Sequence, residues 1–451
     1  MTLVDRASPT DRAFLVMDRG PVPVQFGVVL LLEHAAHLDL ATVRRLVGQR
    51  LGAVPRLSQR LVRAPLGGGG PLWVDDDAFD VRRHVRALDC DDPGDEAALM
   101  REALAQVMRP LPRDAPLWSV GLVTGRPSGG VALVIVLHHV LADGMGGLTV
   151  LGALVDADPS ASPPAPAPAP QPRPPTTRLV ADAWQRRVRA AHEVLPSWRL
   201  LRSAMTASGG LAPPAAARSS LVRRTGPRRA VSVVRVPVAP LAAAAHRHGA
   251  TTNDALLVAV AAALHEVLLA RGEQVDPLLV AVPVSGRVDA DAAALGNSVS
   301  PLLLAVPTTG DLGGRLEQVA AAVRAGHAAA TGPPPIALLG GGFRLLARAG
   351  GYQWYMRHQH RLHTLVSHVR GPREPVCFGG APVTAAIPLA VSENGNLTVS
   401  FQVLTYAGTV TISALVDPDR FPDLDALAAG LRRQLDLVVR SPGTRYPRTG
   451  S

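Results

Sequence analysis

The distribution of apolar residues identifies one place where a strand pattern changes into a helix pattern. An uninterrupted apolar run at residues 131–137, VALVIVL, predicts a buried strand. It is followed by His138 and His139, three apolar residues, and then Asp143 and Gly144. Beyond this point the apolar residues recur at helical spacing. Two adjacent histidines, an acid and a glycine therefore lie where a strand gives way to a helix.

Residues at the end of a strand and in the following loop are often presented on a rigid frame for binding or catalysis. An imidazole can take a proton from a hydroxyl group near neutral pH. Each residue alone has a simpler interpretation. A histidine can be a core residue bonded to a carbonyl, Asp143 can cap the helix, and Gly144 can serve the turn. The whole string HHxxxDG, placed between a strand and a helix, favours a functional site over these alternatives.

The rest of the chain alternates between strand and helix patterns. This alternation is typical of a mixed α/β layer fold. We predict strands at 22–33, 230–238, 278–284, 397–404 and 409–415, and helices at 40–51, 94–108, 255–270 and 423–439.

A proline-rich stretch divides the chain. Residues 159–176, PSASPPAPAPAPQPRPPT, contain too much proline for a helix or a central strand, which predicts an extended, solvated connector. A chain of 451 residues suits two domains, each with its own core. We therefore predict an N-terminal domain at 1–158 that carries HHxxxDG, a proline-rich linker and basic helical crossover at 159–221, and a C-terminal domain at 222–451.

Positive charge is concentrated in the crossover segment. All 46 basic residues are arginine, and the formal net charge is +10. Between residues 171 and 230, twelve arginines are balanced only by Asp182 and Glu193. Such a segment could contact anionic lipid headgroups or the phosphates of CoA, and a solvated basic linker is the equal alternative. Few aromatic residues accompany the arginines, which argues against nucleic acid as a partner.

Targeting and metal-binding patterns are not found in the sequence. Every apolar run of about 18 residues or more includes a charge or a histidine, so no membrane-spanning helix is predicted. The first residues carry acids early and have no apolar core of the signal-peptide type. Cys90 and Cys377 lie far apart and form no metal-binding motif. We expect a cytoplasmic protein without a metal site, with peripheral contact to the inner face of an anionic membrane or to a lipid-droplet surface if the basic segment binds lipid.

Further short motifs accompany the HHxxxDG string. Pro116-Leu117-Trp118 precedes it, Asn253-Asp254 lies at the start of a helix, residues 282–287 end a buried strand as VPVSGR, and Gly296-Asn297 follows. In this order the motifs resemble those of the bacterial wax ester synthase/diacylglycerol acyltransferase family, which belongs to the CoA-dependent acyltransferase superfamily. The resemblance runs from about residue 8 to the final helix, interrupted at the proline-rich linker and the basic segment.

The resemblance implies an α/β fold of two chloramphenicol-acetyltransferase-like domains with the active site in a channel between them. It implies acyl transfer to diacylglycerol or a long-chain alcohol, with acyl-CoA as co-substrate and no bound cofactor or metal. By resemblance, His139 is the base, and His138 and Gly144 shape the turn. Asp143 would hold the loop by pairing with an arginine, for which Arg287 is the candidate.

Three further residues match family positions at which we expect substrate contact. These are Trp118, Asn253 and Asp254. Asn253 is also a candidate for stabilising the oxyanion. The alternatives are that Trp118 is a core anchor and that Asn253 is only a helix N-cap.

One family motif is altered in this chain. The family usually carries a loop resembling SNVPGP, which here is SHVRGP at residues 367–372, with His368 in place of Asn and Arg370 in place of Pro. Because of this change, the motif does not specify the identity of the acyl acceptor. We expect an enzyme that makes triacylglycerol or wax ester. The alternatives are a relative that acylates another hydroxyl or amine, and a catalytically silent homologue that binds lipid or CoA.

Overall fold

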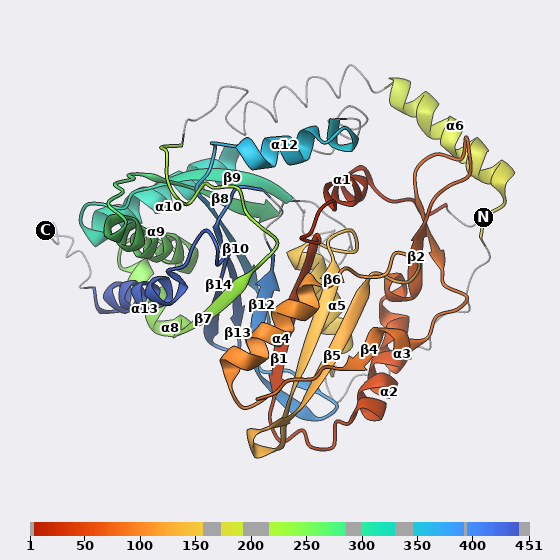
Figure 1. The fold of residues 1–451 in the computed structure, drawn as a ribbon, viewed down its shortest axis with the longest axis horizontal. Coiled ribbons are helices and arrows are strands. Elements are labelled where there is room, and N and C mark those ends of the chain that lie inside the picture. The colour runs from red at the N-terminus through yellow and green to blue at the C-terminus, as the bar shows by residue number, and fades with distance from the viewer. Residues whose placement is uncertain are drawn as a thin grey trace, which may run out of the picture.

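The computed structural model describes residues 4–156, 173–192, 216–285, 299–329, 346–391 and 395–441 (Figure 1). Two six-stranded sheets form its frame. In spatial order, the first sheet contains β11 (Cys377–Phe378), β12 (Ala381–Ala390), β1 (Gln25–Leu32), β6 (Gly130–His138), β5 (Trp118–Arg126) and β4 (Val85–Ala87). The second contains β7 (Ala230–Pro237), β14 (Thr409–Val416), β13 (Val399–Tyr406), β10 (Thr364–Arg370), β8 (Leu278–Ser285) and β9 (Val299–Val306).

Helices and one small ribbon complete the described fold. The ribbon pairs β2 (Gln59–Val62) with β3 (Leu72–Asp75). The α-helices are α1 (Pro9–Met17), α2 (Leu40–Arg50), α3 (Val81–His84), α4 (Glu96–Met108), α5 (Gly144–Leu154), α6 (Thr176–His192), α8 (Val238–His246), α9 (Thr252–Ala270), α10 (Leu312–Ala329), α12 (Gly351–His358) and α13 (Leu424–Arg440).

Strand β6 lies inside the first sheet and explains the apolar run before the histidines. It pairs antiparallel with β1 on one side and with β5 on the other. Every residue of β6 is buried. Because both faces of the strand are covered, its sequence has no polar positions until His138. The predicted buried strand is confirmed.

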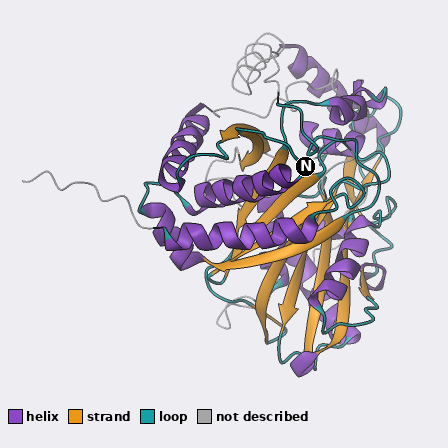
Figure 2. Cartoon of the chain, turned by 60° about the vertical axis from the view of Figure 1, so that its left-hand side comes forward, coloured by secondary structure: helices purple, strands orange, loops and turns teal. Residues whose placement is uncertain are grey.

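The second core is built around α9, which packs against α8, α10 and α13. Figure 2 shows long helices lying across the strands of the second sheet. By length and apolar composition α9 could cross a membrane, and it is the one described helix that could. Most of it is buried inside the protein, and His265 and Glu266 interrupt its apolar sequence. It serves here as a core helix.

A segment from the second half of the sequence joins the first sheet. β12 follows β10 in the chain but pairs antiparallel with β1, and its neighbour β11 forms the edge of the first sheet. The hydroxyl of Tyr406, at the end of β13, fixes this crossover, because it accepts from the Val376 N–H and donates to the Val383 carbonyl, each at 2.9 Å. The predicted division at 158 and 222 did not anticipate that residues 377–390 lie in the first sheet, because a strand pattern does not specify the sheet that the strand joins.

Helix α6 packs against the N-terminal residues of the chain. The Arg6 Nε donates to Asp182 at 2.6 Å, and the Arg6 Nη2 donates to the Leu179 carbonyl at 2.9 Å. The Leu179 side chain is buried in a small apolar cluster with Val4 and Leu72. These contacts dock one face of α6. The basic helical crossover predicted within 159–221 is seen as α6 up to His192, and residues 157–172 and 193–215 lie outside the described residues.

Candidate active site

Backbone hydrogen bonds hold the two histidines at the end of β6. The His138 N–H donates to the Leu117 carbonyl at 3.1 Å, and the His139 N–H donates to the Val24 carbonyl at 3.1 Å. The Leu141 N–H closes the turn on the His138 carbonyl at 2.9 Å. The position of the histidine pair is therefore fixed by segments on both sides of β6.

The His138 ring is part of this turn. Its Nδ1 accepts from the Val140 N–H at 2.9 Å, so the neutral ring carries its proton on Nε2 and donates it to Asp18 Oδ2 at 3.0 Å. Burial of the ring, together with the positive charge of Arg113, lowers the pKa of His138 to about 3. His138 is therefore neutral at physiological pH and is bonded at both ring nitrogens.

Asp18 connects several parts of the site. Its Oδ1 accepts from the Val24 N–H at 2.9 Å, and its Oδ2 accepts from His138 and pairs with Arg113. Val24 in turn accepts the hydrogen bond from the His139 N–H. A single carboxylate at the end of α1 thus orients both histidines. Asp18 could not be identified from the sequence, because one acid after a short helix carries no pattern of its own.

The His139 ring lies between two phenylalanines. Its centroid is 5.3 Å from that of Phe14 in a stacked arrangement, and 4.7 Å from that of Phe26 in a tilted one. The ring is half-buried. Burial lowers the pKa of His139 to about 4, His138 contributes in the same direction, and the backbone of Ala142 acts against both. His139 therefore presents a neutral imidazole at pH 7. Neither phenylalanine, one from α1 and one from β1, was predicted from the sequence as a site residue.

Asp143 begins the helix that follows the histidines. It is the N-cap of α5, and its Oδ1 accepts from the Gly146 N–H at 2.9 Å. Its side chain is buried, with 3% of the residue surface exposed. The helix-cap interpretation describes this contact. Arg287, the predicted partner of Asp143, lies outside the described residues, so the ion pair stays a prediction.

Gly144 is the point at which the second sheet reaches the histidine loop. A Cβ atom on Gly144 would lie 2.9 Å from Cγ2 of Val369, which belongs to β10. Because a methyl group would not fit there, glycine permits the close approach of β10. The loop that carries His139 therefore borders both halves of the molecule.

The altered SHVRGP segment ends β10 and contacts the start of α9. His368 Nδ1 lies 3.2 Å from Asn253 Oδ1, and its Nε2 lies 2.8 Å from the Thr405 hydroxyl. A neutral ring satisfies both contacts if Nδ1–H donates to Asn253 and Nε2 accepts from Thr405. Burial, and then the positive charge of Arg370, lower the pKa of His368 to about 4. The substituted histidine thus holds one of the predicted site residues in place.

Asn253 and Asp254 have different tasks. Thr251 is the N-cap of α9, so the interpretation of Asn253 as the N-cap is wrong. Asp254 is buried and accepts from the Thr251 N–H at 2.7 Å and from its hydroxyl at 2.8 Å, which completes a capping box. These contacts give Asp254 a structural role in the helix cap, and the substrate contact predicted for it stays a prediction. Asn253 lies in the first turn, where its side-chain oxygen meets His368.

Trp118 is also structural. It is 1% exposed, its indole N–H donates to the Leu57 carbonyl at 2.7 Å, and its ring stacks on His84 with the centroids 4.5 Å apart. The His84 Nδ1 in turn donates to the Trp118 carbonyl at 2.9 Å. These are the contacts of a core anchor, the alternative interpretation of Trp118, and the predicted substrate contact stays a prediction. Across the described parts of the chain, no group of three or more His, Cys, Asp or Glu residues could hold a metal ion.

Comparison with known proteins agrees with this geometry. The catalytic-domain model of wax ester synthase/diacylglycerol acyltransferase matches residues 7–256, and the C-terminal-domain model of the same family matches residues 295–438. A protein of Mycobacterium tuberculosis named as a diacylglycerol O-acyltransferase is 28% identical, with 97% of this chain and 90% of the relative covered. A relative from Mycobacterium bovis with the same name is 29% identical, with 93% and 91% covered.

Solved structures share the fold. The wax ester synthase/diacylglycerol acyltransferase from Marinobacter aquaeolei VT8 superposes with a TM-score of 0.68 at 21% identity, with 96% of this chain and 98% of that chain covered. The first condensation domain of the CDA synthetase gives 0.64 at 18% identity, with 97% of each chain covered. The predicted α/β fold of two chloramphenicol-acetyltransferase-like domains is confirmed. With the family models matching along most of its length, the chain belongs to the wax ester synthase/diacylglycerol acyltransferase family and is an acyltransferase.

Proposed function

We propose that the protein transfers a fatty acyl group from acyl-CoA to the hydroxyl of diacylglycerol or a long-chain alcohol, with His139 as the general base. One observation carries the proposal. His139 is a neutral, half-buried imidazole, held between two aromatic rings on a loop that the second sheet touches at Gly144. A general base must be unprotonated, and the position of His139 on a loop that borders both halves of the molecule supports this role.

The reaction balances with the groups of this chain and the two substrates. The acceptor oxygen attacks the thioester carbonyl while His139 takes the hydroxyl proton. The tetrahedral intermediate then collapses, the carbon–sulfur bond breaks, and the imidazolium returns its proton to the leaving thiolate. The products are the ester and free CoA. Asp18 and His138 take no proton in this scheme, because their contacts hold the loop rather than the substrate.

The negative oxygen of the intermediate requires a hydrogen-bond donor, and one such donor is worth ~3–4 kcal/mol in other acyl-transfer enzymes. Asn253 is our candidate. Its side-chain oxygen is engaged by His368, which orients the amide and leaves its nitrogen as the donating group.

The identity of the acceptor is the open part of the proposal. His368 and Arg370 replace the usual residues of the family motif, and His368 contacts Asn253 directly. This contact favours a second candidate function, acylation of another hydroxyl or of an amine. A catalytically silent homologue is disfavoured because His139, Asp143 and Gly144 keep an ordered arrangement.

A release-of-CoA assay over a panel of acyl-CoAs and acceptors tests the proposal. The panel should contain diacylglycerol, long-chain alcohols, and amines of matched length. We expect thiol release that depends on a hydroxyl acceptor, with the ester identified by mass spectrometry. Release only with amines would support the second candidate function. No release of CoA with any acceptor would support the alternative that the protein is a catalytically silent homologue.

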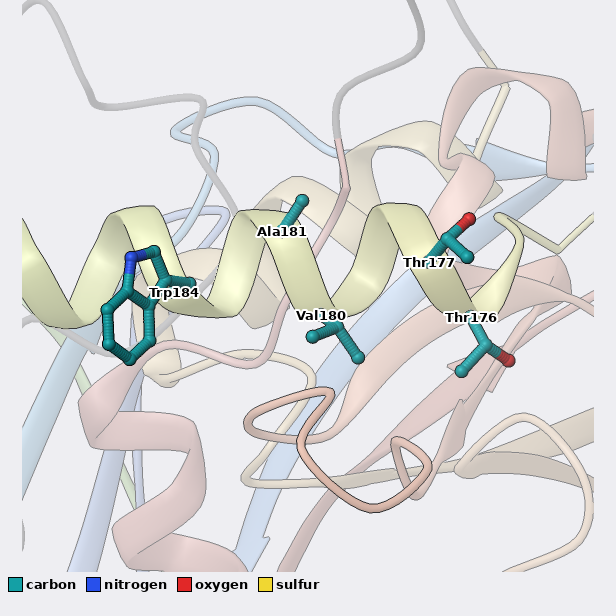
Figure 3. Close-up of a pocket in the computed structure, with 5 residues that line it drawn as sticks. All are labelled: Thr176, Thr177, Val180, Ala181 and Trp184. Carbon is teal, nitrogen blue, oxygen red and sulfur yellow. The ribbon is translucent and has the colours of Figure 1, made fainter.

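Membrane contact is a further part of the proposal. Of ten exposed large hydrophobic side chains in the described residues, seven lie on or beside two helices and one loop: Leu66, Val180, Trp184, Val188, Leu346, Trp354 and Tyr355. Val180, Trp184 and Val188 recur every fourth residue of α6, and Figure 3 shows Val180 and Trp184 on the same side of the helix. Aromatic residues beside arginines fit an anionic membrane surface.

A paired substitution tests this surface. V180S/W184S should weaken binding to phosphatidylglycerol vesicles in a sedimentation assay, and binding by the unaltered protein should fall as salt rises. L437S is the matched control, because Leu437 is also exposed but lies on α13. Unchanged vesicle binding in the double variant, or equal binding to neutral vesicles, would leave the basic segment as a solvated linker.

A further inference from the structure

An arginine-lined cavity lies between α1, the β2–β3 ribbon and α6. Its volume is about 1960 Å³, larger than the roughly 300–1,000 Å³ of most small-molecule pockets. Ten arginines line it, and Asp182 is the only acidic residue among the described residues of its wall. The ten are Arg6, Arg12, Arg19, Arg63, Arg113, Arg178, Arg186, Arg187, Arg189 and Arg348.

Part of this arginine set is fixed by the protein itself. Arg6 and Arg186 both bond to Asp182, and Arg113 pairs with Asp18. The remaining guanidinium groups outnumber the acids of the wall, so bringing them together is electrostatically unfavourable without an anion. The guanidinium group binds phosphate oxygens in a bidentate manner, which makes clustered phosphates the anion that this wall suits best.

The cavity is connected to the histidine loop. Arg113 lines it and pairs with Asp18, which accepts the hydrogen bond from His138. Leu117 also lines it, and the Leu117 carbonyl accepts from the His138 N–H. Helix α1 forms part of the wall and contributes Phe14 to the contact with His139. In Figure 1, α1 lies beyond the end of β6 on the side toward α6.

We infer that this cavity binds the 3′-phosphate and diphosphate groups of the CoA thioester, at a distance from the reacting carbonyl. The inference rests on the proposed acyl-CoA donor. The pantetheine arm separates the phosphates of CoA from its sulfur, so their site stands apart from His139. A lipid phosphate has the same chemistry, but the connection of the wall to His138 favours the donor. Docking of α6 would then complete the donor site, since α6 supplies Arg178, Arg186, Arg187 and Arg189 to it.

The test compares two triple variants of equal charge. R63Q/R187Q/R348Q removes three exposed arginines of the wall from three different segments. R45Q/R86Q/R101Q removes three exposed arginines from α2, β4 and α4. Binding of CoA, 3′-dephospho-CoA and pantetheine to the full chain is measured by calorimetry. We expect the wall variant to bind CoA at least ~10-fold more weakly and the control to stay within about 2-fold, because each lost guanidinium removes a phosphate contact. Pantetheine binding should be equal in all three proteins.

Turnover gives an independent result. The wall variant should raise the KM for acyl-CoA without lowering kcat, and should leave the KM for an acyl-pantetheine thioester unchanged. Equal CoA binding by wall and control variants would overturn the inference, as would a loss of phosphatidylglycerol-vesicle binding with CoA binding intact. If the native protein binds CoA through the wall arginines but transfers no acyl group, the proposed function fails and the cavity assignment stands. The lysine variant R63K/R187K/R348K keeps the positive charge of the wall. Its affinity for CoA should lie between those of the wall variant and the control variant, which would exclude misfolding as the cause of weaker binding.

Discussion

Two segments meet at the site, the loop after β6 and the end of β10, and they differ in what holds them. The loop after β6 is fixed by backbone bonds to Leu117 and Val24, by Asp18, and by the cap at Asp143. The end of β10 is held by its parallel pairing with β13 and by the side chain of His368. Gly371 donates to the Thr405 carbonyl at 2.8 Å, and His368 contacts Asn253 and Thr405 through its side chain. The first segment carries the family string intact, and the second is where this chain departs from the family.

This difference suggests that the two segments have different functions. A group that moves a proton must be held within a fraction of an ångström, which requires many contacts. A surface that selects an acceptor can change one side chain at a time while the chemistry is retained. We therefore expect substitutions in the β6 loop to remove activity and substitutions at the end of β10 to redirect it.

Replacement of His139 by alanine should have the largest effect. We expect kcat to fall at least ~100-fold and up to about 10⁴-fold, the range of general-base catalysis, with the fold retained. His138→Ala should cost less turnover. Far-ultraviolet circular dichroism and the melting temperature provide the folding control. Near-native turnover by His139→Ala would exclude the proposed mechanism.

The pH profile of the native protein belongs to the same test. Activity requires unprotonated His139, so it should be lost as the pH falls through the pKa of this group. Because that pKa is lowered to about 4, the acid limb of kcat/KM should lie well below the ordinary histidine pKa of 6.5. Stability should change in the same direction. His138, His139 and His368 have lowered pKa values, so the unfolded chain binds more protons below pH 6.5, and unfolding becomes easier on acidification.

Breaking the predicted Asp143–Arg287 ion pair should have the next largest effect. Removing one partner of a shielded pair strands a buried charge, which costs roughly 3–5 kcal/mol in the free energy of unfolding. Asp143→Ala and Arg287→Ala should both lower stability and activity, and the double variant should lose less than the sum, as chemical denaturation can measure. Additive losses would remove Arg287 from the site and leave Asp143 as the cap of α5.

The sequence predicted the β6 loop well because its features are local. The apolar run at 131–137, the histidines and the capping acid follow one another within a single strand–loop–helix unit. The predicted helices at 40–51, 94–108 and 423–439 are confirmed for the same reason. A structure formed by residues that are close in the sequence can be predicted from the pattern of those residues.

The features that the sequence did not predict depend on distant parts of the chain. Asp18 reaches His138 across 120 residues, and β12 joins a sheet whose other main strands come from the first half. Trp118 matched a family motif, but its burial against His84 became visible only in three dimensions. A motif thus locates a residue in a family, and its contacts decide what the residue does.

Asp18→Asn tests whether orientation by α1 matters for the β6 loop. Asparagine keeps the size and one acceptor oxygen but removes the charge that faces Arg113, so we expect a fall in kcat of roughly ten-fold, less than that of removing the base. Because Asp18 acts through His138 and Val24, the KM for both substrates should change little. Asp18→Glu should restore part of the rate if the carboxylate matters. A loss of melting temperature with unchanged kcat would mark Asp18 as structural only.

His368→Asn should have the smallest effect on rate and the clearest effect on selectivity. The substitution restores the usual family residue, and a shorter amide cannot keep both contacts that His368 makes with Asn253 and Thr405. Because the substitution restores the residue that the family usually carries at this position, we expect kcat with a favoured acceptor to change only a few-fold. The ratio of kcat/KM between diacylglycerol and a long-chain alcohol should shift by up to roughly 10-fold, since loss of one hydrogen bond to an oriented group is worth about 0.5–1.5 kcal/mol. Thr405→Val removes the hydroxyl contact alone and provides the matched comparison. An unchanged ratio in both variants would place acceptor selection elsewhere, whereas a large fall in kcat with every acceptor would show that Asn253, held by His368, stabilises the reacting oxygen itself.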